Sequence, residues 1–148
     1  MKQILYIDMD GVLVNFQTGI DRLSDSIKTQ YEGSLDHVPG IFSLMDPMNE
    51  AIESYQILSK KFDTYILSTS PWENTTAASD KFAWVRKHLG IVAHKRLILS
   101  HHKHLNNGHY LIDDRPNNGA DKFTGEWILF GSEKFPNWKV VTDYLSNK

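Results

Sequence analysis

The sequence predicts an α/β protein, built as a Rossmann-like, three-layer parallel sheet with a small helical segment inserted after the first strand. Short apolar runs typical of buried strands alternate along the chain with segments that carry apolar residues at helical spacing. That alternation favours a parallel sheet covered on both faces. With 148 residues, the chain is long enough for a single core. We therefore expect residues 1–148 to form one domain.

Five apolar runs are the candidate strands. The first, Ile4–Ile7, contains β-branched and aromatic residues and has no helical spacing. Three later runs each contain an apolar stretch that is followed directly by polar residues or proline. The fifth run is rich in large apolar side chains. These later runs are 61–71, 95–100, 109–116 and 126–130.

Three segments have helical spacing, and we expect an amphipathic helix in each. Residues 49–58 carry apolar side chains at positions 51, 52, 55 and 58, and residues 78–89 carry them at 82, 85 and 89. Gly90 follows the second segment directly and is typical of a helix C-terminus. The last segment, 138–145, places four apolar or aromatic side chains on one side of a helix: Val140, Val141, Tyr144 and Leu145.

Residues 17–46 break this alternation. Positions 20–27 are helix-like, but Gly33, Pro39 and Gly40 follow with few strong secondary-structure signals. We interpret the stretch 17–46 as a small, mostly helical cap insertion.

The composition narrows the chemistry and the partners. The formal net charge of −2 favours neither a nucleic acid polymer nor a membrane surface as partner. The chain contains no cysteine, so disulfides, thiolate metal sites and a cysteine nucleophile are excluded. No apolar stretch approaches membrane-spanning length, and the N-terminal run turns acidic too soon for a signal peptide. We expect a cytoplasmic protein, and the sequence gives no indication of its oligomeric state.

Acidic side chains gather where the predicted strands end. Asp8 and Asp10 follow the first strand, and Asp113 and Asp114 follow the fourth. In an open parallel sheet, ligands bind beyond the carboxyl ends of the strands. Carboxylates gathered there repel one another unless a cation lies among them. A hard divalent ion such as Mg²⁺ meets this need and would bind through one or two carboxylates plus a phosphate.

Hydrogen-bond donors follow the other two strands of this group. Residues 68–70 are Ser-Thr-Ser, and residues 100–103 end on Lys103. Hydroxyls and an ammonium group suit phosphate oxygens, so the whole set indicates phosphoryl transfer. Asp8 would attack phosphorus as a nucleophile, while Asp10 would protonate the leaving alcohol and later activate water. Gly11 would let the backbone turn sharply and approach the phosphate.

These residues, in this order, resemble the haloacid dehalogenase superfamily of aspartate-nucleophile phosphatases. Its first motif, DxDGx, matches residues 8–12, its second is a strand-ending Thr or Ser, its third a lysine and its fourth a pair of acids. Within that superfamily the chain looks most like the 5'(3')-deoxyribonucleotidases. The shared segments are DMDGVLxxF at 8–16, TSP at 69–71, KxxWVxxxxG at 81–90 and LIDDRP at 111–116. Residues 41–51 are also similar to the stretch where that family's helical cap returns to the core.

The resemblance implies a Mg²⁺-dependent phosphatase that acts on nucleoside monophosphates, in particular deoxyribonucleotides, through an aspartyl-phosphate. It makes Asp8 the nucleophile and Asp10 the acid/base. The phosphate ligands it implies are Thr69 and Lys103, with the neighbouring Ser70 and Gly11 also at the phosphate.

The same resemblance implies a metal site and a base pocket. The metal would be held by Asp8, by Asp113 or Asp114, and by the backbone carbonyl of Asp10. Phe16 and Phe42 match aromatic positions that line the family's base pocket, and Lys81 is a further candidate for substrate binding.

Two segments depart from the family pattern. The insertion at 17–46 is about half as long as the cap of the vertebrate-type enzymes, and the cap shapes the base pocket. The loop before the phosphate lysine usually reads TRDK, whereas this chain has Ser100-His101-His102-Lys103.

Each signal also has a purely structural interpretation. Acids in a turn can be solvated, and Thr69 and Ser70 can cap the following helix. Lysines are mostly solvated surface residues. The histidines at 101, 102, 104 and 109 suggest a zinc site, but adjacent histidines on an extended chain point in different directions. The four strand-end groups taken together favour the catalytic interpretation.

Three alternative functions stay open. A phosphatase of the same superfamily could act on another small phosphomonoester, such as a sugar phosphate, because a short cap leaves the pocket more open. A receiver-type signalling domain also gathers acids, a hydroxyl and a lysine, but it needs its acceptor Asp after a middle strand, whereas 68–70 and Ser100 end the middle strands here. A phosphate-binding module without catalysis is the third alternative, although every chemical role is filled.

Overall fold

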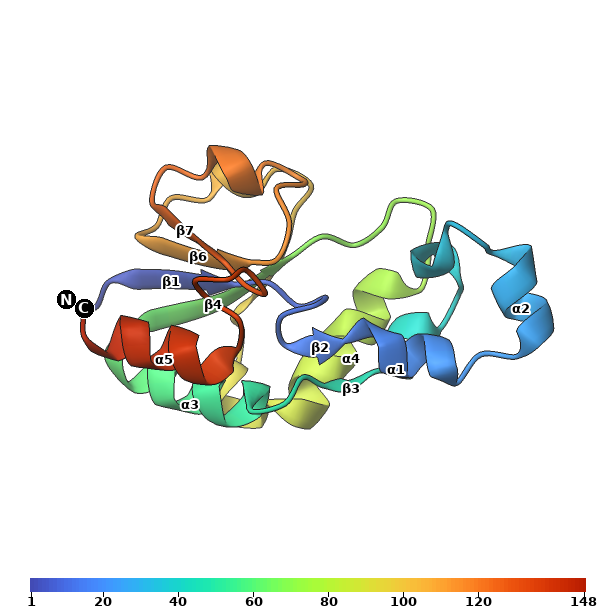
Figure 1. Ribbon diagram of the computed structural model, residues 1–148, viewed down its shortest axis with the longest axis horizontal. Coiled ribbons are helices and arrows are strands. Elements are labelled where there is room, and N and C mark those ends of the chain that lie inside the picture. The colour runs from blue at the N-terminus through green and yellow to red at the C-terminus, as the bar shows by residue number, and fades with distance from the viewer.

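The core of the protein is a five-stranded parallel sheet with the strand order β5-β4-β1-β6-β7. The computed structural model describes residues 1–148, and Figure 1 shows the sheet with its covering helices. Each strand falls within one of the predicted apolar runs, so the predicted α/β class with a parallel sheet is confirmed. The strands are β1 (Ile4–Ile7), β4 (Asp63–Ser68), β5 (Leu97–Leu99), β6 (Tyr110–Asp113) and β7 (Glu126–Leu129).

β1 is the central strand of the sheet. Its Ile7 pairs with Ile66 of β4 on one side and with Ile112 of β6 on the other. From β1 the chain passes to β4 and β5 at one edge, and then returns to β6 and β7 at the other. The strand order therefore reverses between β1 and β6, where an open parallel sheet offers a crevice for ligands.

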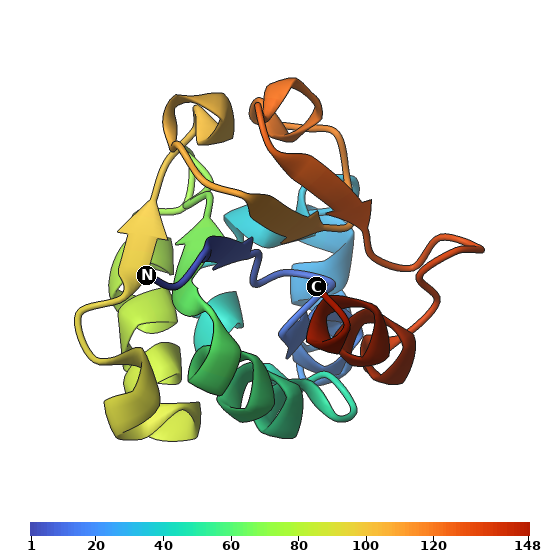
Figure 2. The same ribbon diagram turned by 90° about the vertical axis from the view of Figure 1, so that its left-hand side faces the viewer.

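Three helices cover one face of the sheet: α3 (Ala51–Lys61), α4 (Ala77–His88) and α5 (Trp138–Ser146). Figure 2 shows them together beneath the strands. They pack against the β1 residues Leu5 and Ile7 in one buried apolar cluster. None of the helices has the length and apolar character that crossing a membrane requires.

The opposite face is covered by loops and by two short 3-10 turns, η4 (Lys103–Leu105) and η5 (Ala120–Lys122). Because alternate strand residues point to opposite faces, Tyr6 lies here and packs in a smaller cluster with Phe123. The second covering layer therefore consists of turns instead of helices. Both segments that cross this face contain Asn-Asn-Gly, at 106–108 and 117–119, and such sequences favour turns over helices.

The segment between β2 (Val14–Asn15) and β3 (Asp46–Pro47) forms a separate small lobe beside the sheet (Figure 1). The two strands pair antiparallel and bring the ends of the segment together. The helix-like spacing at 20–27 does not produce one helix. Instead α1 (Phe16–Asp21) ends before Ser24, whose hydroxyl accepts a hydrogen bond from Ile27 N and caps α2 (Asp25–Gln30). A serine N-cap inside the apolar pattern explains the break.

Hydrogen bonds fix this lobe to the loop after β4 and to α4. The Asn74 side-chain amide donates to the carbonyls of Asp36 and Val38, at 2.9 Å and 3.0 Å. The Trp84 indole donates to the Met45 carbonyl at 2.9 Å. The remaining elements of the lobe are the 3-10 turns η1 (Leu35–His37) and η2 (Ile41–Ser43). The lobe is thus held over the carboxyl ends of the strands.

The loop after β1 is anchored from below by the C-terminal helix. Trp138, at the start of α5, is 1% exposed, and its indole N–H donates to the Val12 carbonyl at 2.8 Å. The last helix of the chain therefore supports the turn that carries the first acidic motif.

We predict that Trp138→Phe lowers the free energy of unfolding by about 1–3 kcal/mol, because the buried Val12 carbonyl loses its donor while the aromatic packing largely stays. Thermal unfolding followed by circular dichroism measures the change. Trp72→Phe is the matched control, since Trp72 is 84% exposed, and it should shift the Tm by less than about 2 °C. Equal Tm values for the two variants would contradict the anchoring role of Trp138.

Candidate active site

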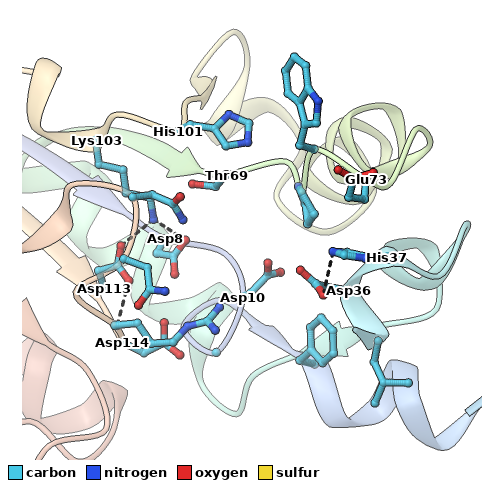
Figure 3. Close-up of a pocket in the computed structure, with 18 of the residues that line it drawn as sticks. Asp8, Asp10, Asp36, His37, Thr69, Glu73, His101, Lys103, Asp113 and Asp114 are labelled. Carbon is cyan, nitrogen blue, oxygen red and sulfur yellow. Dashed lines mark hydrogen bonds and ion pairs between the residues drawn. The ribbon is translucent and has the colours of Figure 1, made fainter. Parts of the chain in front are cut away.

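A cavity of about 710 Å³ lies at the carboxyl ends of the strands, between the sheet and the small lobe. Figure 3 shows acidic side chains and Lys103 on one side of it and Asp36, His37 and Glu73 on another. Its volume falls in the range of about 300–1,000 Å³ that is common for small-molecule sites. The residues predicted from sequence that line it are Asp8, Asp10, Gly11, Phe16, Thr69, Lys103, Asp113 and Asp114.

A tight turn after β1 presents the first two acids. The N–H groups of Val12, Leu13 and Val14 all donate to the Met9 carbonyl, at distances from 2.9 Å to 3.1 Å. Gly11 has a φ of +76°, and a Cβ at this position would overlap the Asp114 carboxylate. Glycine is therefore required both by the backbone conformation and by the close approach of Asp114.

Lys103 bridges the acid after β1 and the first acid after β6. Its Nζ lies 3.0 Å from Asp8 Oδ1 and 2.6 Å from Asp113 Oδ2. All three side chains are at least nine-tenths buried. Burial opposes the charge on Lys103, but the carboxylates of Asp8 and Asp113 more than offset it and raise the pKa of the lysine. Lys103 therefore keeps its charge and neutralises part of the acidic cluster.

The acids themselves resist ionisation at this site. Burial raises the pKa of Asp8 to about 7, and the charges of Asp113 and Asp10 add to the rise, while Lys103 opposes it. Burial, followed by the charge of Asp8, raises the pKa of Asp114 to about 6. The pKa of Asp113 is also raised, chiefly by burial. Such shifts are expected where carboxylates are crowded away from water.

The donor set fits a divalent metal ion. Oxygen atoms of Asp8, Asp113 and Asp114 lie within 4.8 Å of one another. Asp114 Oδ1 is buried and has no hydrogen-bond partner, as expected for an oxygen whose partner is a cation. Both Asp113 oxygens are engaged, with Lys103 and with the Arg115 backbone N–H at 3.1 Å. Asp114 is thus the freer of the two acids predicted as metal ligands.

The three hydroxyl residues at the end of β4 differ in their position relative to the cavity. Thr69 lines the cavity, and its hydroxyl donates to the Ser100 carbonyl at 2.7 Å, which ties the β4 and β5 loops together. Ser70 is not among the cavity-lining residues. Ser68 is fully buried and lies beneath the site, where its hydroxyl accepts from Lys81 at 2.7 Å.

The three predicted substrate-binding residues pack against one another, and only Phe16 lines the cavity. The Phe16 and Phe42 rings pack edge to face, with their centroids 5.9 Å apart. Phe42 is 2% exposed, and its ring lies 4.6 Å from Lys81 Nζ, which is itself fully buried. Phe42 and Lys81 therefore lie behind the cavity wall.

The structure adds residues to the cavity that the sequence motifs did not predict. Trp72 is largely exposed, and its ring lies 6.0 Å from that of His101. Asp36, His37 and Glu73 line the cavity on the side of the small lobe, and Arg115, Asn117 and Asn118 line it next to the β6 acids. Most of them lie in loops and turns outside the matched family segments. Two had a sequence signal: Arg115 lies within the LIDDRP segment at 111–116, and Trp72 directly follows the TSP segment.

The comparison with protein families gives one match over most of the chain. Residues 22–142 match the family described as "5' nucleotidase, deoxy (Pyrimidine), cytosolic type C protein". A proposed 5'(3')-deoxyribonucleotidase of Vibrio phage KVP40 is 58% identical over 147 residues, which covers 99% of this chain and 86% of that protein. The human cytosolic-type 5'(3')-deoxyribonucleotidase is 27% identical over 169 residues, covering 91% of this chain and 76% of that protein.

Solved structures with little sequence identity share the fold. The HAD-hydrolase YfnB of Bacillus subtilis, crystallised with magnesium, has a TM-score of 0.59 at 14% identity and covers 92% of this chain and 90% of its own. A haloacid dehalogenase-like hydrolase of Streptococcus pneumoniae has a TM-score of 0.58 at 13% identity, covering 97% of this chain and 90% of its own. The predicted resemblance is confirmed: the chain belongs to the family of deoxy-type, cytosolic type C 5'-nucleotidases and has the haloacid dehalogenase hydrolase fold.

Proposed function

We propose that the protein is a Mg²⁺-dependent phosphatase that hydrolyses nucleoside monophosphates, in particular deoxyribonucleotides, through an aspartyl-phosphate. Membership of the 5'-deoxynucleotidase family supports a nucleotidase-type phosphoric monoester hydrolase. The observation that carries the proposal is the bridge from Lys103 to Asp8 and Asp113 at the edge of a cavity of small-molecule size. It brings a nucleophile, a fixed cation and spare carboxylate oxygens to one place.

The charge count explains why a divalent cation suits the site. With Asp8, Asp113 and Asp114 ionised and Asp10 protonated, as its role of proton donor requires, three carboxylates face two buried lysines, Lys81 and Lys103. One carboxylate charge is left over, a bound phosphate adds further negative charge, and Mg²⁺ would balance both. We assign Asp8, Asp114 and the backbone carbonyl of Asp10 to the ion, with Asp113 as the residue that holds Lys103.

In the first half-reaction, a carboxylate oxygen of Asp8 forms a bond to phosphorus while the bond to the leaving alcohol breaks. Asp10 gives its proton to the alcohol oxygen as that bond breaks. Lys103 has one N–H that neither Asp8 nor Asp113 uses, and it would donate this hydrogen to a phosphoryl oxygen. The Thr69 hydroxyl would do the same after turning away from the Ser100 carbonyl. Mg²⁺, when bound, reduces the repulsion between the Asp8 carboxylate and the phosphate.

In the second half-reaction, Asp10 removes a proton from water, and the water oxygen attacks the phosphorus of the aspartyl-phosphate. The bond from Asp8 to phosphorus breaks, inorganic phosphate leaves, and both carboxyl groups return to their starting states. Gly11 leaves room for the Asp114 carboxylate directly beside the reacting groups.

Two of the alternative functions can be compared with this proposal. The expectation that the middle strands end in hydroxyls is wrong, because β1 is the central strand in space and Asp8 follows it. Strand position therefore does not disfavour a receiver-type domain, whereas the family match does. A sugar phosphate stays the main rival substrate, since Phe16 and Leu35 are the only large apolar side chains that the small lobe contributes to the cavity.

The test of the function is a substrate panel with Mg²⁺ and release of inorganic phosphate as the readout. We expect kcat/KM for dUMP or dTMP to exceed that for ribonucleotides and sugar phosphates by about tenfold or more. Asp8→Asn should lower it by at least about 10³-fold. Asp143→Asn is the matched control, because Asp143 is exposed and remote in the C-terminal helix. Faster hydrolysis of a sugar phosphate would favour the rival, and full activity of Asp8→Asn would rule out the aspartyl-phosphate.

Gly11→Ala should abolish most of the activity. The added methyl group must displace Asp114, and a shift of about 1 Å in such a group can cost about 10²-fold in rate. The measurement is kcat/KM, together with the Mg²⁺ concentration that gives half-maximal activity. Gly131→Ala is the control, because Gly131 has the same left-handed backbone (φ +87°) but open space around its Cβ position. Equal activities of the two variants would contradict the close-approach role.

The stability of the metal-free protein should fall as the pH rises. Because the pKa of Asp8 is raised from 3.8 to about 7, the folded state binds more protons than the unfolded chain in this window. The contribution of Asp8 is fully present below about pH 4 and is lost as the pH rises through about 7.

We therefore predict that the Tm in EDTA drops by about 5 °C or more between about pH 5 and pH 8. Excess Mg²⁺ should raise the Tm more at pH 8 than at pH 5, since binding needs ionised carboxylates. In Asp8→Asn the pH slope should be smaller. An Asp8→Asn slope as steep as that of the unaltered protein would contradict this assignment.

A further inference from the structure

The ammonium group of Lys81 has no hydrogen-bonding capacity left for a substrate. Its three N–H donors match three acceptors: Asp10 Oδ2 at 3.0 Å, Ser68 Oγ at 2.7 Å and the Thr69 carbonyl at 2.8 Å. The side chain is fully buried and does not line the cavity. This environment is at odds with the expectation that Lys81 binds the substrate.

The two carboxylate oxygens of Asp10 differ in their hydrogen bonding. Oδ2 is held by the lysine, whereas Oδ1 is buried and has no hydrogen-bond partner in the protein. Asp10 lines the cavity, and Figure 3 shows its side chain between Asp8 and the small lobe. One oxygen is thus fixed by Lys81, and the hydrogen-bonding capacity that Asp10 keeps for proton exchange with a ligand is at Oδ1.

The remaining side of the ammonium group is closed by the small lobe. The Phe42 ring, from η2, lies 4.6 Å from Lys81 Nζ, within the range of a cation–π contact. Phe42 in turn packs against Phe16, which does line the cavity. Through these contacts the lobe shields the Lys81 ammonium group from water and connects it to the cavity wall.

We propose that Lys81 is a positioning residue that orients Asp10 for proton transfer. Phe42 of the small lobe supports this role by excluding water from the Lys81 side of the Lys81–Asp10 ion pair. The proposal rests on the proposed role of Asp10 as the acid/base. It assigns to the lobe a part in the chemical step itself, through the ring that it places over Lys81, in addition to any contact with the nucleoside.

The leaving group distinguishes this role from substrate binding and from a purely structural one. A nucleoside leaves as a poor alkoxide unless Asp10 protonates it, whereas p-nitrophenolate leaves without a proton. A misplaced Asp10 should therefore slow nucleotide hydrolysis much more than p-nitrophenyl phosphate hydrolysis. Loss of a phosphate ligand would raise KM for both substrates, and loss of folding would reduce both activities equally.

The experiment measures kcat and KM of Lys81→Met with dUMP and with p-nitrophenyl phosphate. We expect kcat for dUMP to fall by about 10²-fold and kcat for p-nitrophenyl phosphate by less than about tenfold, with KM values within about twofold of the unaltered protein. The double variant Asp10→Asn, Lys81→Met should be no slower with dUMP than Asp10→Asn alone, because both changes remove the same proton transfer. Phe42→Leu, which keeps the apolar volume, should show the same substrate-selective loss in weaker form.

Equal losses with both substrates in Lys81→Met and Phe42→Leu, or an effect confined to KM, would overturn the proposal. So would additive losses in the double variant. If the unaltered protein hydrolyses aryl phosphates but no nucleotide, the proposed substrate is wrong. The role of Lys81 is then tested with a series of aryl and alkyl phosphates whose leaving groups differ in pKa. In that series, the slope of log kcat against leaving-group pKa should be steeper for Lys81→Met, and an unchanged slope would overturn the proposal.

Discussion

The structure depends on holding four carboxylates together at the end of a buried sheet. Like charges at such distances repel strongly where water is excluded. The protein offsets this repulsion with two buried lysines, each paired with a different part of the cluster. Lys103 joins Asp8 to Asp113, and Lys81 holds Asp10 from the opposite side. The rest of the fold places these two ammonium groups.

Strand pairing explains why the acids meet. β1 and β6 are hydrogen-bonded neighbours in register, and the Asp8 N–H donates to the Ile112 carbonyl at 2.9 Å. The acids that follow the two strands therefore emerge side by side. Two tryptophans stabilise the backbone that carries the acids, since Trp138 donates to the Val12 carbonyl in the loop after β1 and Trp127 to the Asp113 carbonyl at the end of β6. Rigid backbone beneath the cluster keeps the side chains in place despite their mutual repulsion.

Polar and aromatic contacts hold the small lobe against the rest of the protein. Polar contacts from Asn74 and Trp84 fix its backbone, and Phe42 reaches the lysine behind Asp10. A lobe held in this way favours a preformed cavity over a freely swinging cover.

The sequence by itself determined the sheet, its helices and the acids at its edge. Buried parallel strands must be apolar runs, and the groups that follow them must gather at one edge, so Asp8, Lys103 and Asp113 were predictable from local pattern together with family resemblance. Local pattern failed where a short capping signal competed with apolar spacing, as at Ser24, and where Asn-Asn-Gly turns replaced helices on the second face.

Tertiary structure alone decided which strand is central, which oxygens are free and which basic groups face the cavity. The spatial position of β1 depends on pairing between segments far apart in the chain, and no local periodicity encodes it. Lys81 and Lys103 look alike in sequence, yet one lies behind Asp10 with every donor used and the other bridges two acids at the cavity. The physical reason is that hydrogen-bond satisfaction is a property of the packed neighbourhood, which exists only once distant segments have come together.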